Sequence, residues 1–192
     1  MKFILAKKVN MTQIFGEDGK VSAGTILNVA PIVVSQVKNS EKDGYNAVQV
    51  AAFSRKTKNL SKSVKGHLKD LINENEGFGL LKEFRTDDST LNKGDKINVE
   101  VFAVGDKVTV SSVSKGKGFQ GVVKRHGFHG GPRSHGQKHS EREPGSIGGG
   151  GRSAGRVVKG MRMAGRTGGD KVTVKNLKVL GVDAENNLMI VS

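Results

Sequence analysis

Short runs in which apolar and polar residues alternate recur along most of the chain. Over Lys96–Phe102 every second residue from Ile97 to Val101 is apolar, which is the period of a half-buried β-strand. Similar runs predict further strands at Gly24–Val29, Ile32–Val37, Lys107–Val110, Lys171–Val174, Leu177–Val182 and Leu188–Val191. The polar residues Asp183–Asn187 are typical of a hairpin connection between the last two. Strands this short and closely spaced predict a mainly β fold, a small barrel or a sandwich.

One segment has the period of a helix instead. Its apolar residues fall at positions i, i+4, i+7 and i+8, namely Val64, Leu68, Leu71 and Ile72. This spacing predicts a single helix with one apolar face. Gly77 follows it as a stop signal.

The first residues and the lack of cysteine exclude several classes of protein. Met1–Lys8 contains only a four-residue apolar run before two lysines, whereas a secretory signal needs about 7–15 apolar residues and a membrane span about 20. Because the chain has no cysteine, disulfide bridges, a thiol nucleophile and cysteine zinc sites are excluded. We therefore expect a cytoplasmic protein with no membrane partner.

Charge is distributed unevenly along the chain. The net charge is +14, and Lys115–Gly169 alone carries +10, from 12 Lys and Arg residues against the two acids Glu141 and Glu143. The same 55 residues hold 17 of the 27 glycines. The sequence therefore predicts an ordinary domain interrupted by a basic, glycine-rich extension, which we call the arm.

The arm has too few apolar residues, in no regular period, to close a core of its own, so alone it is expected to be disordered. A partner with dense negative charge would order it, since glycine allows close approach of the backbone to phosphates. A merely solvated surface would mix charges of both signs. No recognition helix or zinc-finger pattern is present. RNA is therefore favoured over duplex DNA as the partner.

Within the arm, Gly116–Gly121 matches the dinucleotide fingerprint G-x-G-x-x-G. That fingerprint requires a helix directly afterwards, because the pyrophosphate sits on the N-terminus of that helix. No helix of useful length is expected here, because the following residues include Gly127, Gly130, Gly131 and Pro132. The sequence therefore disfavours a nucleotide cofactor.

The four histidines of the arm have a spacing that superficially suggests a metal site: His126, His129, His135 and His139. The surrounding Lys and Arg residues would repel a divalent cation, and glycine offers no rigid scaffold for metal ligands. Donors to phosphate or stacking partners for bases are the favoured roles. The chain also lacks the common catalytic motifs. We expect no enzyme activity, no cofactor, no metal and no small-molecule substrate.

Several segments, in this order along the chain, resemble the family of ribosomal protein L-three of the large subunit. They are Met11–Phe15, Tyr45–Val50, Lys115–Phe128, Ser134–Gly136, Pro144–Gly148, Gly160–Gly165 and Val182–Leu188. The resemblance covers nearly the whole chain. It implies a six-stranded Greek-key barrel of the translation-protein type, with a small α+β insertion and a long basic arm. It places the barrel at residues 1–44, 96–114 and 170–192, the insertion at 45–95 and the arm at 115–169.

In that family the arm runs along large-subunit rRNA towards the peptidyl transferase centre, the barrel touches neighbouring large-subunit proteins, and the protein acts early in assembly. Carried over by motif and charge, the residues expected to bind rRNA are Lys115, Lys117, Lys124, Arg125, His126, Arg133, His135, Lys138, His139, Arg142, Arg152, Arg156, Lys159, Arg162 and Arg166. Ile147, Gly148 and Gly149 are expected near the tip of the arm. The expected function is a non-enzymatic structural constituent of the ribosome; the alternative is a free RNA chaperone or regulator that uses the arm transiently.

This chain departs from the family pattern in three places. Asn10 stands where members usually have glycine, and asparagine also tolerates a positive φ. Gly149 stands where many bacterial members carry a glutamine that is methylated, so that modification is not possible here. Relatives usually continue beyond the position of Ser192 with a Val-Pro-Gly turn and another strand. Either the barrel closes differently in this chain or the sequence is shortened.

Overall fold

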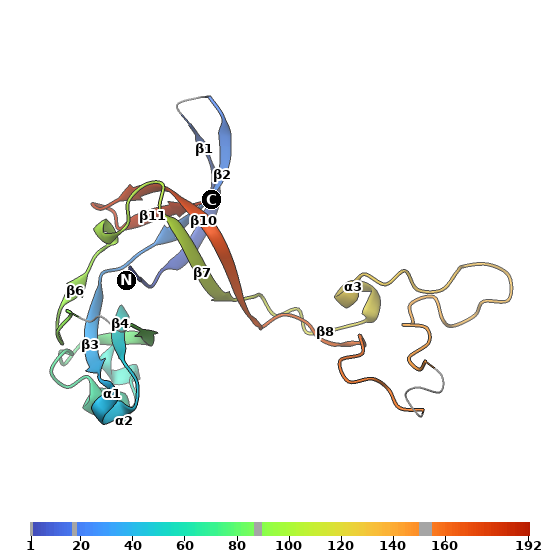
Figure 1. Cartoon of the computed structure of the whole chain (residues 1–192), viewed down its shortest axis with the longest axis horizontal. Helices are drawn as coiled ribbons and strands as arrows, with labels where there is room; N and C mark the ends of the chain where they lie inside the picture. Colours follow the sequence, from blue (N-terminus) through green and yellow to red (C-terminus); the bar gives the residue numbers. More distant parts are fainter. Residues whose placement is uncertain (1, 17–18, 87–89, 150–154) are drawn as a thin grey trace. The chain divides into compact units, whose positions relative to one another are not determined.

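Most of the regular structure in this chain is β-strand, which confirms the predicted mainly β fold (Figure 1). The computed structural model describes residues 2–16, 19–86, 90–149 and 155–192. The chain divides into two units. The first unit is Met1–Val108 together with Asn176–Ser192, and the second is Thr109–Lys175.

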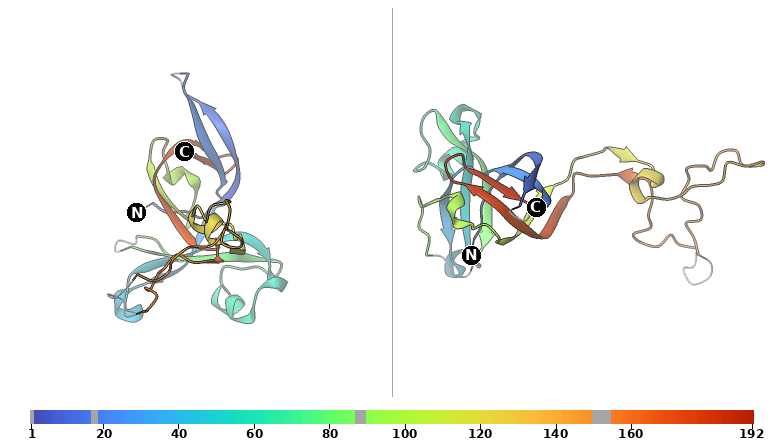
Figure 2. Two further views of the ribbon diagram at one scale, coloured as in Figure 1. Left: turned by 90° about the vertical axis from the view of Figure 1, so that its right-hand side faces the viewer. Right: turned by 90° about the horizontal axis from the view of Figure 1, so that it is seen from above.

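The larger sheet has five strands in the order β1-β2-β11-β10-β7. Their bounds are β1 (Lys7–Phe15), β2 (Val21–Asn28), β11 (Leu188–Val191), β10 (Lys171–Asp183) and β7 (Lys107–Val113). The pairs β1–β2, β10–β11 and β11–β2 are all antiparallel. The β1–β2 hairpin extends beyond the other strands of the first unit (Figure 2). β7 and β10 continue into the second unit, so the chain enters and leaves that unit through neighbouring strands.

A second sheet, of four strands, lies within the first unit in the order β5-β4-β3-β6. Its strands are β5 (Glu76–Arg85), β4 (Ala47–Lys56), β3 (Ile32–Lys38) and β6 (Lys96–Ile97). All neighbouring strands are antiparallel, and β4 and β5 pair over their full lengths. The connection between β4 and β5 carries the 3₁₀ turn η1 (Thr57–Asn59) and the helix α2 (Lys62–His67).

The remaining elements are short. They are α1 (Ser40–Asp43), the 3₁₀ turn η2 (Val99–Val101), α3 (Val122–His126), and the two-stranded ladder of β8 (Phe119–Gln120) with β9 (Gly165–Arg166). Among the described residues, no helix is long and apolar enough to cross a membrane.

Two clusters of buried apolar residues stabilise the first unit. One lies on the four-stranded sheet and consists of Phe3, Ile32, Val34, Val48, Val50, Ala52 and Ile97. The other lies on the five-stranded sheet and consists of Leu27, Val29, Val99, Phe102, Val179, Met189 and Val191. Ile4 packs against both clusters. The N-terminal segment also stacks Phe3 on Phe84 of β5, with ring centroids 4.5 Å apart. Burial of this apolar surface is the main stabilising contribution to the unit.

Most of the predicted strands are confirmed, but Lys171–Val174 and Leu177–Val182 are parts of one continuous strand, β10. The strand predicted over Lys96–Phe102 is much shorter than expected. The strand ends at Ile97, and the chain then makes the 3₁₀ turn η2, closed by the Phe102 amide donating to the Val99 carbonyl (3.0 Å). Val99 is buried, whereas Val101 is 38% exposed. The buried residues Ile97 and Val99 are two positions apart, as in a strand, but Val99 and Phe102 are three apart, as in a 3₁₀ turn. The alternation of apolar residues therefore predicted a strand that is too long.

The predicted helix is also shorter than its apolar pattern. α2 begins after Ser61, whose hydroxyl accepts a hydrogen bond from the Val64 amide (3.4 Å), and it ends at His67. The Leu71 amide still bonds the Leu68 carbonyl (2.8 Å), so the next residues form a turn rather than a further helical turn. Leu68 is completely buried. The apolar spacing therefore identified the buried side but not the end of the helix.

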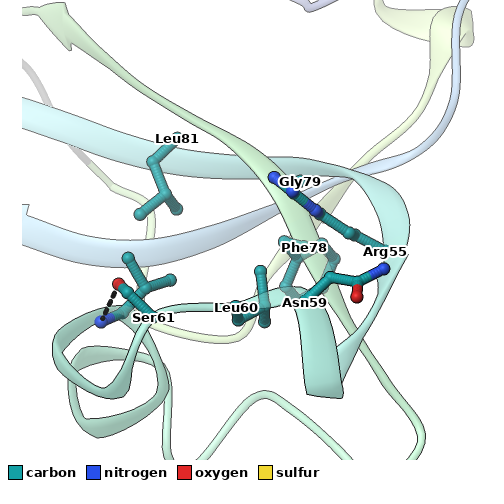
Figure 3. Close-up of a pocket in the computed structure, with 8 residues that line it drawn as sticks. Arg55, Asn59, Leu60, Ser61, Phe78, Gly79 and Leu81 are labelled. Atoms are coloured by element: carbon teal, nitrogen blue, oxygen red, sulfur yellow. Dashed lines mark hydrogen bonds between the residues drawn. The ribbon is translucent and has the colours of Figure 1, made fainter.

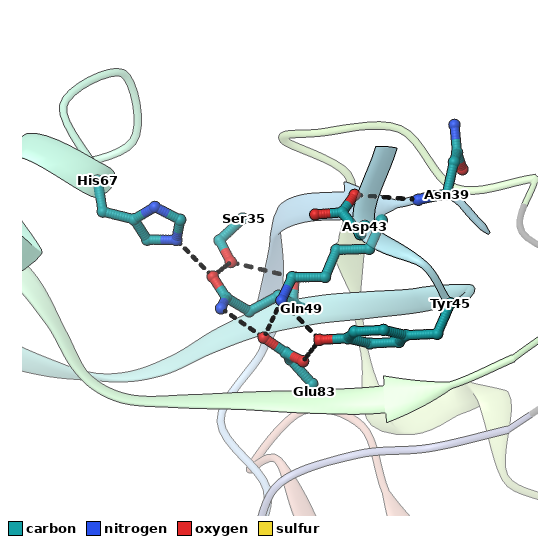
Figure 4. A network of polar contacts seen from close by, with 8 residues as sticks. Ser35, Asn39, Asp43, Tyr45, Gln49, His67 and Glu83 are labelled. Atoms are coloured by element: carbon teal, nitrogen blue, oxygen red, sulfur yellow. Dashed lines mark hydrogen bonds and ion pairs between the residues drawn. The ribbon is translucent and has the colours of Figure 1, made fainter. Parts of the chain in front are cut away.

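A polar network joins α2 to the strands of the four-stranded sheet (Figure 4). Gln49 of β4 is at its centre: its side-chain oxygen accepts from the Ser35 hydroxyl (2.8 Å) and from His67 Nε2 (2.6 Å), and its Nε2 donates to Glu83 (3.2 Å). Glu83 also pairs with Lys38 Nζ (2.8 Å). The network fixes α2 against the sheet.

The same contacts shift two pKa values. The Lys38 ammonium and the Tyr45 hydroxyl, which donates to Glu83 at 2.9 Å, lower the pKa of the Glu83 carboxyl. In return the Glu83 carboxylate and the Tyr45 hydroxyl raise the pKa of Lys38 above its ordinary value. Both groups are therefore held in their charged forms.

Candidate nucleic-acid interface

The two ends of the second unit form an antiparallel stem, made of residues 109–120 and 165–175. Near its base the Ser111 and Thr173 hydroxyls are 2.7 Å apart, and the Ser114 amide donates to the Asp170 carbonyl (2.9 Å). Further along, the Lys117 amide donates to Thr167 (2.8 Å), and β8 pairs with β9. Backbone pairing of this kind needs no apolar core, and it gives the basic side chains of the stem fixed positions.

One glycine of the stem is required by its surroundings. Gly168 has φ +76°, in the left-handed region, and a Cβ built on it would overlap the backbone carbonyl of Lys115. Any other residue would therefore be strained and would push the two strands apart. Part of the arm's high glycine content thus has a structural reason of its own.

The short helix α3 is hydrogen-bonded to the segment that leads into β9. The Arg125 guanidinium donates to the Met163 carbonyl (2.8 Å), and His126 Nε2 lies 3.1 Å from the same oxygen. The helix ends at Gly127, which has φ +71°. Because α3 spans only five residues, the prediction that no useful helix follows the G-x-G-x-x-G match is confirmed.

Beyond α3 the arm consists of loops held by a few backbone bonds. The Gly131 amide lies 3.2 Å from the Ser140 carbonyl and 3.1 Å from that of Glu141. Arg133 Nε donates to Glu141 Oε2 at 2.8 Å, with 82% of the Arg133 side chain exposed. An exposed ion pair of this kind contributes about 0–1 kcal/mol, so Arg133 can exchange it for a phosphate at little loss.

The expectation that the arm is disordered on its own is wrong for its ends. β8, α3 and β9 all lie between residues 115 and 169. Their stability comes from backbone hydrogen bonds and from the side chains that bond the Met163 carbonyl, and composition alone does not reveal either.

Comparison with known proteins identifies the family. The family described as Ribosomal protein L3 matches residues 7–189. The chain belongs to the ribosomal protein L3 family. The large ribosomal subunit protein uL3 of Herpetosiphon aurantiacus is 46% identical over 189 residues, covering 98% of this chain and 87% of the relative. The uL3 of Dehalococcoides mccartyi is 47% identical (98% and 89% covered), and that of Chlorobium limicola is 43% identical (100% and 91% covered). These matches confirm the resemblance that the motifs indicated.

The basic residues that the L3 resemblance singles out are nearly all at the surface of the second unit. His126 is half-buried, and Arg152 lies outside the described residues. The exposed ones are Lys115, Lys117, Lys124, Arg125, Arg133, His135, Lys138, His139, Arg142, Arg156, Lys159, Arg162 and Arg166. Arg125, His126 and Arg133 also have partners within the unit, so they position the arm as well as presenting charge.

The residues expected at the arm tip lie in a segment without helix or strand. Ile147 is 38% exposed, and a Cβ on Gly148 or Gly149 would meet nothing within 4 Å. The Ser146 hydroxyl donates to the Gly148 carbonyl (2.9 Å). In the described part of the chain, no group of three or more His, Asp or Glu residues is arranged to hold a metal ion. The His126 ring instead lies beside Phe128, with centroids 5.9 Å apart.

One basic segment was missed because charge was counted over all residues outside the arm together. Those residues carry a net charge of only +4. Within them, Arg55–Lys69 contains six Lys and Arg residues and no acid. A count in windows of about 15 residues would have found this segment.

Proposed function

We propose that this chain is a structural constituent of the large ribosomal subunit in the cytoplasm, and that it binds large-subunit rRNA through its arm. Membership of the L3 family supports this, as do the relatives named as large ribosomal subunit proteins. The observation that carries the proposal is a hydrogen-bonded stem and loop with exposed Lys and Arg side chains. Of the two acids in the arm, Glu141 already pairs with Arg133. Such a surface neutralises phosphates between RNA helices that would otherwise repel one another.

The binding residues in this proposal are the basic and histidine side chains named above, Arg152 included. Lys and Arg bind phosphate oxygens, and histidine donates to phosphates or stacks on bases. The role requires no catalysis and no cofactor. It consists of holding RNA in place.

The finer parts of the proposal concern the rest of the architecture. The five-stranded sheet forms part of a six-stranded Greek-key barrel of the translation-protein type at residues 1–44, 96–114 and 170–192, with an α+β insertion at 45–95. The barrel touches neighbouring large-subunit proteins. The arm extends towards the peptidyl transferase centre, with Ile147–Gly149 near its tip, and the protein acts early in subunit assembly. The order β1-β2-β11-β10-β7, which brings both ends of the chain into one sheet, supports the barrel.

The salt dependence of rRNA binding tests the central step. Each phosphate neutralised contributes about −0.7 to −0.9 to the slope of log K against log salt, where K is the binding constant for rRNA. If about half of the 12 Lys and Arg residues of the arm bind phosphates, that slope is about −4 to −5. Replacing Lys115, Lys117 and Arg166 with glutamine should reduce that slope by about 2–3. Replacing Lys42, Lys96 and Lys178 with glutamine is the matched control and should change it by less than about 1. A slope near zero for the unaltered chain would contradict the proposal.

A sucrose gradient separates this role from that of a transient RNA chaperone. A structural constituent stays with large subunits at moderate salt. A chain that leaves the subunits under these conditions would favour the transient role.

A further inference from the structure

The outer edge of β1 is open. Among the described strands, β1 pairs with β2 alone and ends the five-stranded sheet on that side. Within the described part of the chain, no other backbone hydrogen bond involves Lys7–Phe15. An edge of this kind presents N–H and C=O groups with which a further strand can pair.

The face of the β1–β2 hairpin that meets solvent is apolar. Across the hairpin Phe15 lies opposite Val21, and Gln13 lies opposite Ala23. Met11 is on the same face as Phe15, because side chains four positions apart in a strand point to the same side. Met11, Phe15 and Val21 are 63%, 72% and 54% exposed. The solvent face of an antiparallel sheet is ordinarily polar, so an apolar one indicates a site of interaction.

The opposite face of the hairpin is already packed against its own sheet. A Cβ built on Gly24 would lie 2.9 Å from Ile190 Cγ2 of β11 and 3.0 Å from Ile14 Cδ1 of β1. Ile14 and Ile190 therefore meet over Gly24 and fix the hairpin at its base. The solvent face of the hairpin is thus held in position without a partner, and it loses little conformational entropy when it binds one.

Elsewhere in the first unit the chain covers apolar side chains of a sheet itself. A hollow of about 370 Å³ lies between α2 and β5 (Figure 3), and Leu60, Val64 and Phe78 are among the residues that line it. Leu60 packs so closely over β5 that a Cβ on Gly77 would lie 2.6 Å from Leu60 Cδ1. Within the described residues, the solvent face of the hairpin has no such cover.

Charge indicates the kind of partner. Met1–Gly16 contains Lys2, Lys7 and Lys8 and no acid. Lys2 pairs with Asp106 at 2.8 Å, whereas Lys8 is exposed and forms no ion pair with a described residue. A strand with acids at the end beside Lys8 therefore complements this edge. A second copy of the chain is disfavoured, because each copy has a net charge of +14. Apolar side chains offer phosphates no hydrogen bond, so RNA suits this face less than protein does.

We propose that the hairpin surface, meaning the outer edge of β1 and the face formed by Met11, Phe15, Val21 and Ala23, docks an extended segment of an acidic protein. The segment pairs with β1 as an added strand, and its acidic end meets Lys8. Main-chain hydrogen bonds supply the affinity, and the apolar side chains beside Met11 and Phe15 supply the specificity. The proposed function includes protein contacts of the barrel without a site. The inference rests on it to that extent and adds the site, the binding mode and the chemistry of the partner.

A short peptide tests strand addition to the full chain. The probe is Glu-Glu-Val-Thr-Val-Thr-Val-Thr-Val-Glu-Glu with a fluorescent label. In the control peptide the two central valines are replaced by proline, which keeps the charge but removes two N–H donors. We expect the control to bind about tenfold or more weakly, because proline cannot donate to a strand edge. Equal binding of the two peptides would show that charge alone attracts them, and it would overturn the proposal.

Variants of the full chain test where the probe binds. Met11→Thr with Phe15→Thr removes the apolar side chains and keeps residues that suit a strand. Both side chains are exposed, so this variant should fold, and we expect its affinity for the probe to fall about tenfold or more. Leu80→Thr with Val104→Thr is the control, because both residues are exposed and apolar and lie elsewhere in the first unit. It should change the affinity less than about twofold. Equal affinities of the two double variants would overturn the proposal.

Amide hydrogen exchange identifies the occupant. The probe should slow exchange in β1 and leave the arm unchanged. Slower exchange confined to the arm would mean that the peptide binds there by charge. Slower exchange in β1 as the concentration of the chain alone rises would assign the edge to a second copy, and slower exchange caused by oligouridine would assign it to RNA. Each of these three results would overturn the proposal.

The peptide measurements contain no rRNA, so they separate this inference from the proposed function. If the probe does not bind while rRNA binding has a salt slope of about −4 to −5, the hairpin surface is refuted and the role of the arm stands. If the probe binds as expected while the slope for rRNA is near zero, the role of the arm is refuted and the hairpin surface stands.

Discussion

The α-carbon of Gly168 lies against the backbone carbonyl of Lys115, on the opposite strand of the stem, with no room for a side chain between them. This contact sets the spacing of the two strands at the point where the arm leaves the paired part of β7 and β10. A hydrogen bond beside this contact, from the Lys117 amide to the Thr167 carbonyl, also holds the strands together. The two interactions keep Lys115 and Lys117 at fixed positions.

Gly168→Ala should therefore open the stem. The left-handed φ alone costs about 1–3 kcal/mol for a residue with a Cβ, and overlap with the Lys115 carbonyl adds to it. We expect faster amide hydrogen exchange at Lys117 and Thr167 and weaker rRNA binding. Gly116→Ala is the control, because its Cβ would meet nothing within 4 Å. Equal exchange rates in the two variants would contradict this account of the stem.

Arg125 should matter more than its neighbour Lys124. Both side chains are exposed, but only Arg125 donates to the Met163 carbonyl and so anchors α3 to the segment that leads into β9. Under the proposed function each residue binds a phosphate, so Arg125→Met removes that contact together with the anchor, whereas Lys124→Met removes the phosphate contact alone. We expect a larger loss of rRNA affinity and faster amide exchange at residues 163–166 for the arginine variant. Equal losses would show that α3 is held by other contacts.

Bulk at the arm tip should harm the ribosome rather than the free protein. Gly148 and Gly149 have open space around them in this structure, so replacing both with valine should leave the melting temperature and the salt slope nearly unchanged. If the tip packs deep in the subunit, the same variant should reduce the yield of large subunits or slow translation. Normal growth of cells that rely on it would refute the tip assignment.

The stability of the first unit should fall in acid through Glu83. Lys38 and Tyr45 lower the pKa of this carboxyl in the folded chain, so the stabilisation is complete above the unfolded value of about 4.5. It is lost as the pH falls through the lowered folded pKa. Glu83→Gln should lower the melting temperature at pH 7 and flatten its dependence on pH below 5.

The control for this variant is Glu76→Gln, an exposed glutamate on the same strand. It removes the same charge without touching Lys38 or Gln49. Identical pH profiles for the two variants would mean that the network of Figure 4 contributes nothing measurable to stability.

The sequence predicted those parts of the fold in which local pattern and burial agree. The β10–β11 hairpin was expected at its polar connection, and β2 and β3 were expected from their β-branched runs. β1 was missed as a strand, because Gln13 interrupts the apolar alternation of Val9, Met11 and Phe15. In the structure those three side chains are exposed. Pairing with β2, not a buried apolar face, defines that strand.

The candidate site was predicted in composition but not in geometry. The charge count identified the arm, because an excess of Lys and Arg residues can be read from the sequence whatever the fold. It could not show that Arg125 and His126 turn back to the Met163 carbonyl, because that contact joins residues 37 or more positions apart. The basic segment Arg55–Lys69 escaped notice for a different reason, since acids elsewhere outside the arm cancelled its charge in the sum.

Chemical footprinting of large-subunit rRNA tests the central claim most directly. The full chain is compared with one in which Lys115–Gly169 is replaced by an Asn-Gly turn. The ends left by this deletion already face each other, because the Ser114 amide bonds the Asp170 carbonyl, and Asn-Gly suits a two-residue hairpin. If the arm penetrates the RNA, protections deep in the subunit disappear in the shortened chain while those at the surface persist. If both chains protect the same nucleotides, the arm is a solvated tail and the account is wrong.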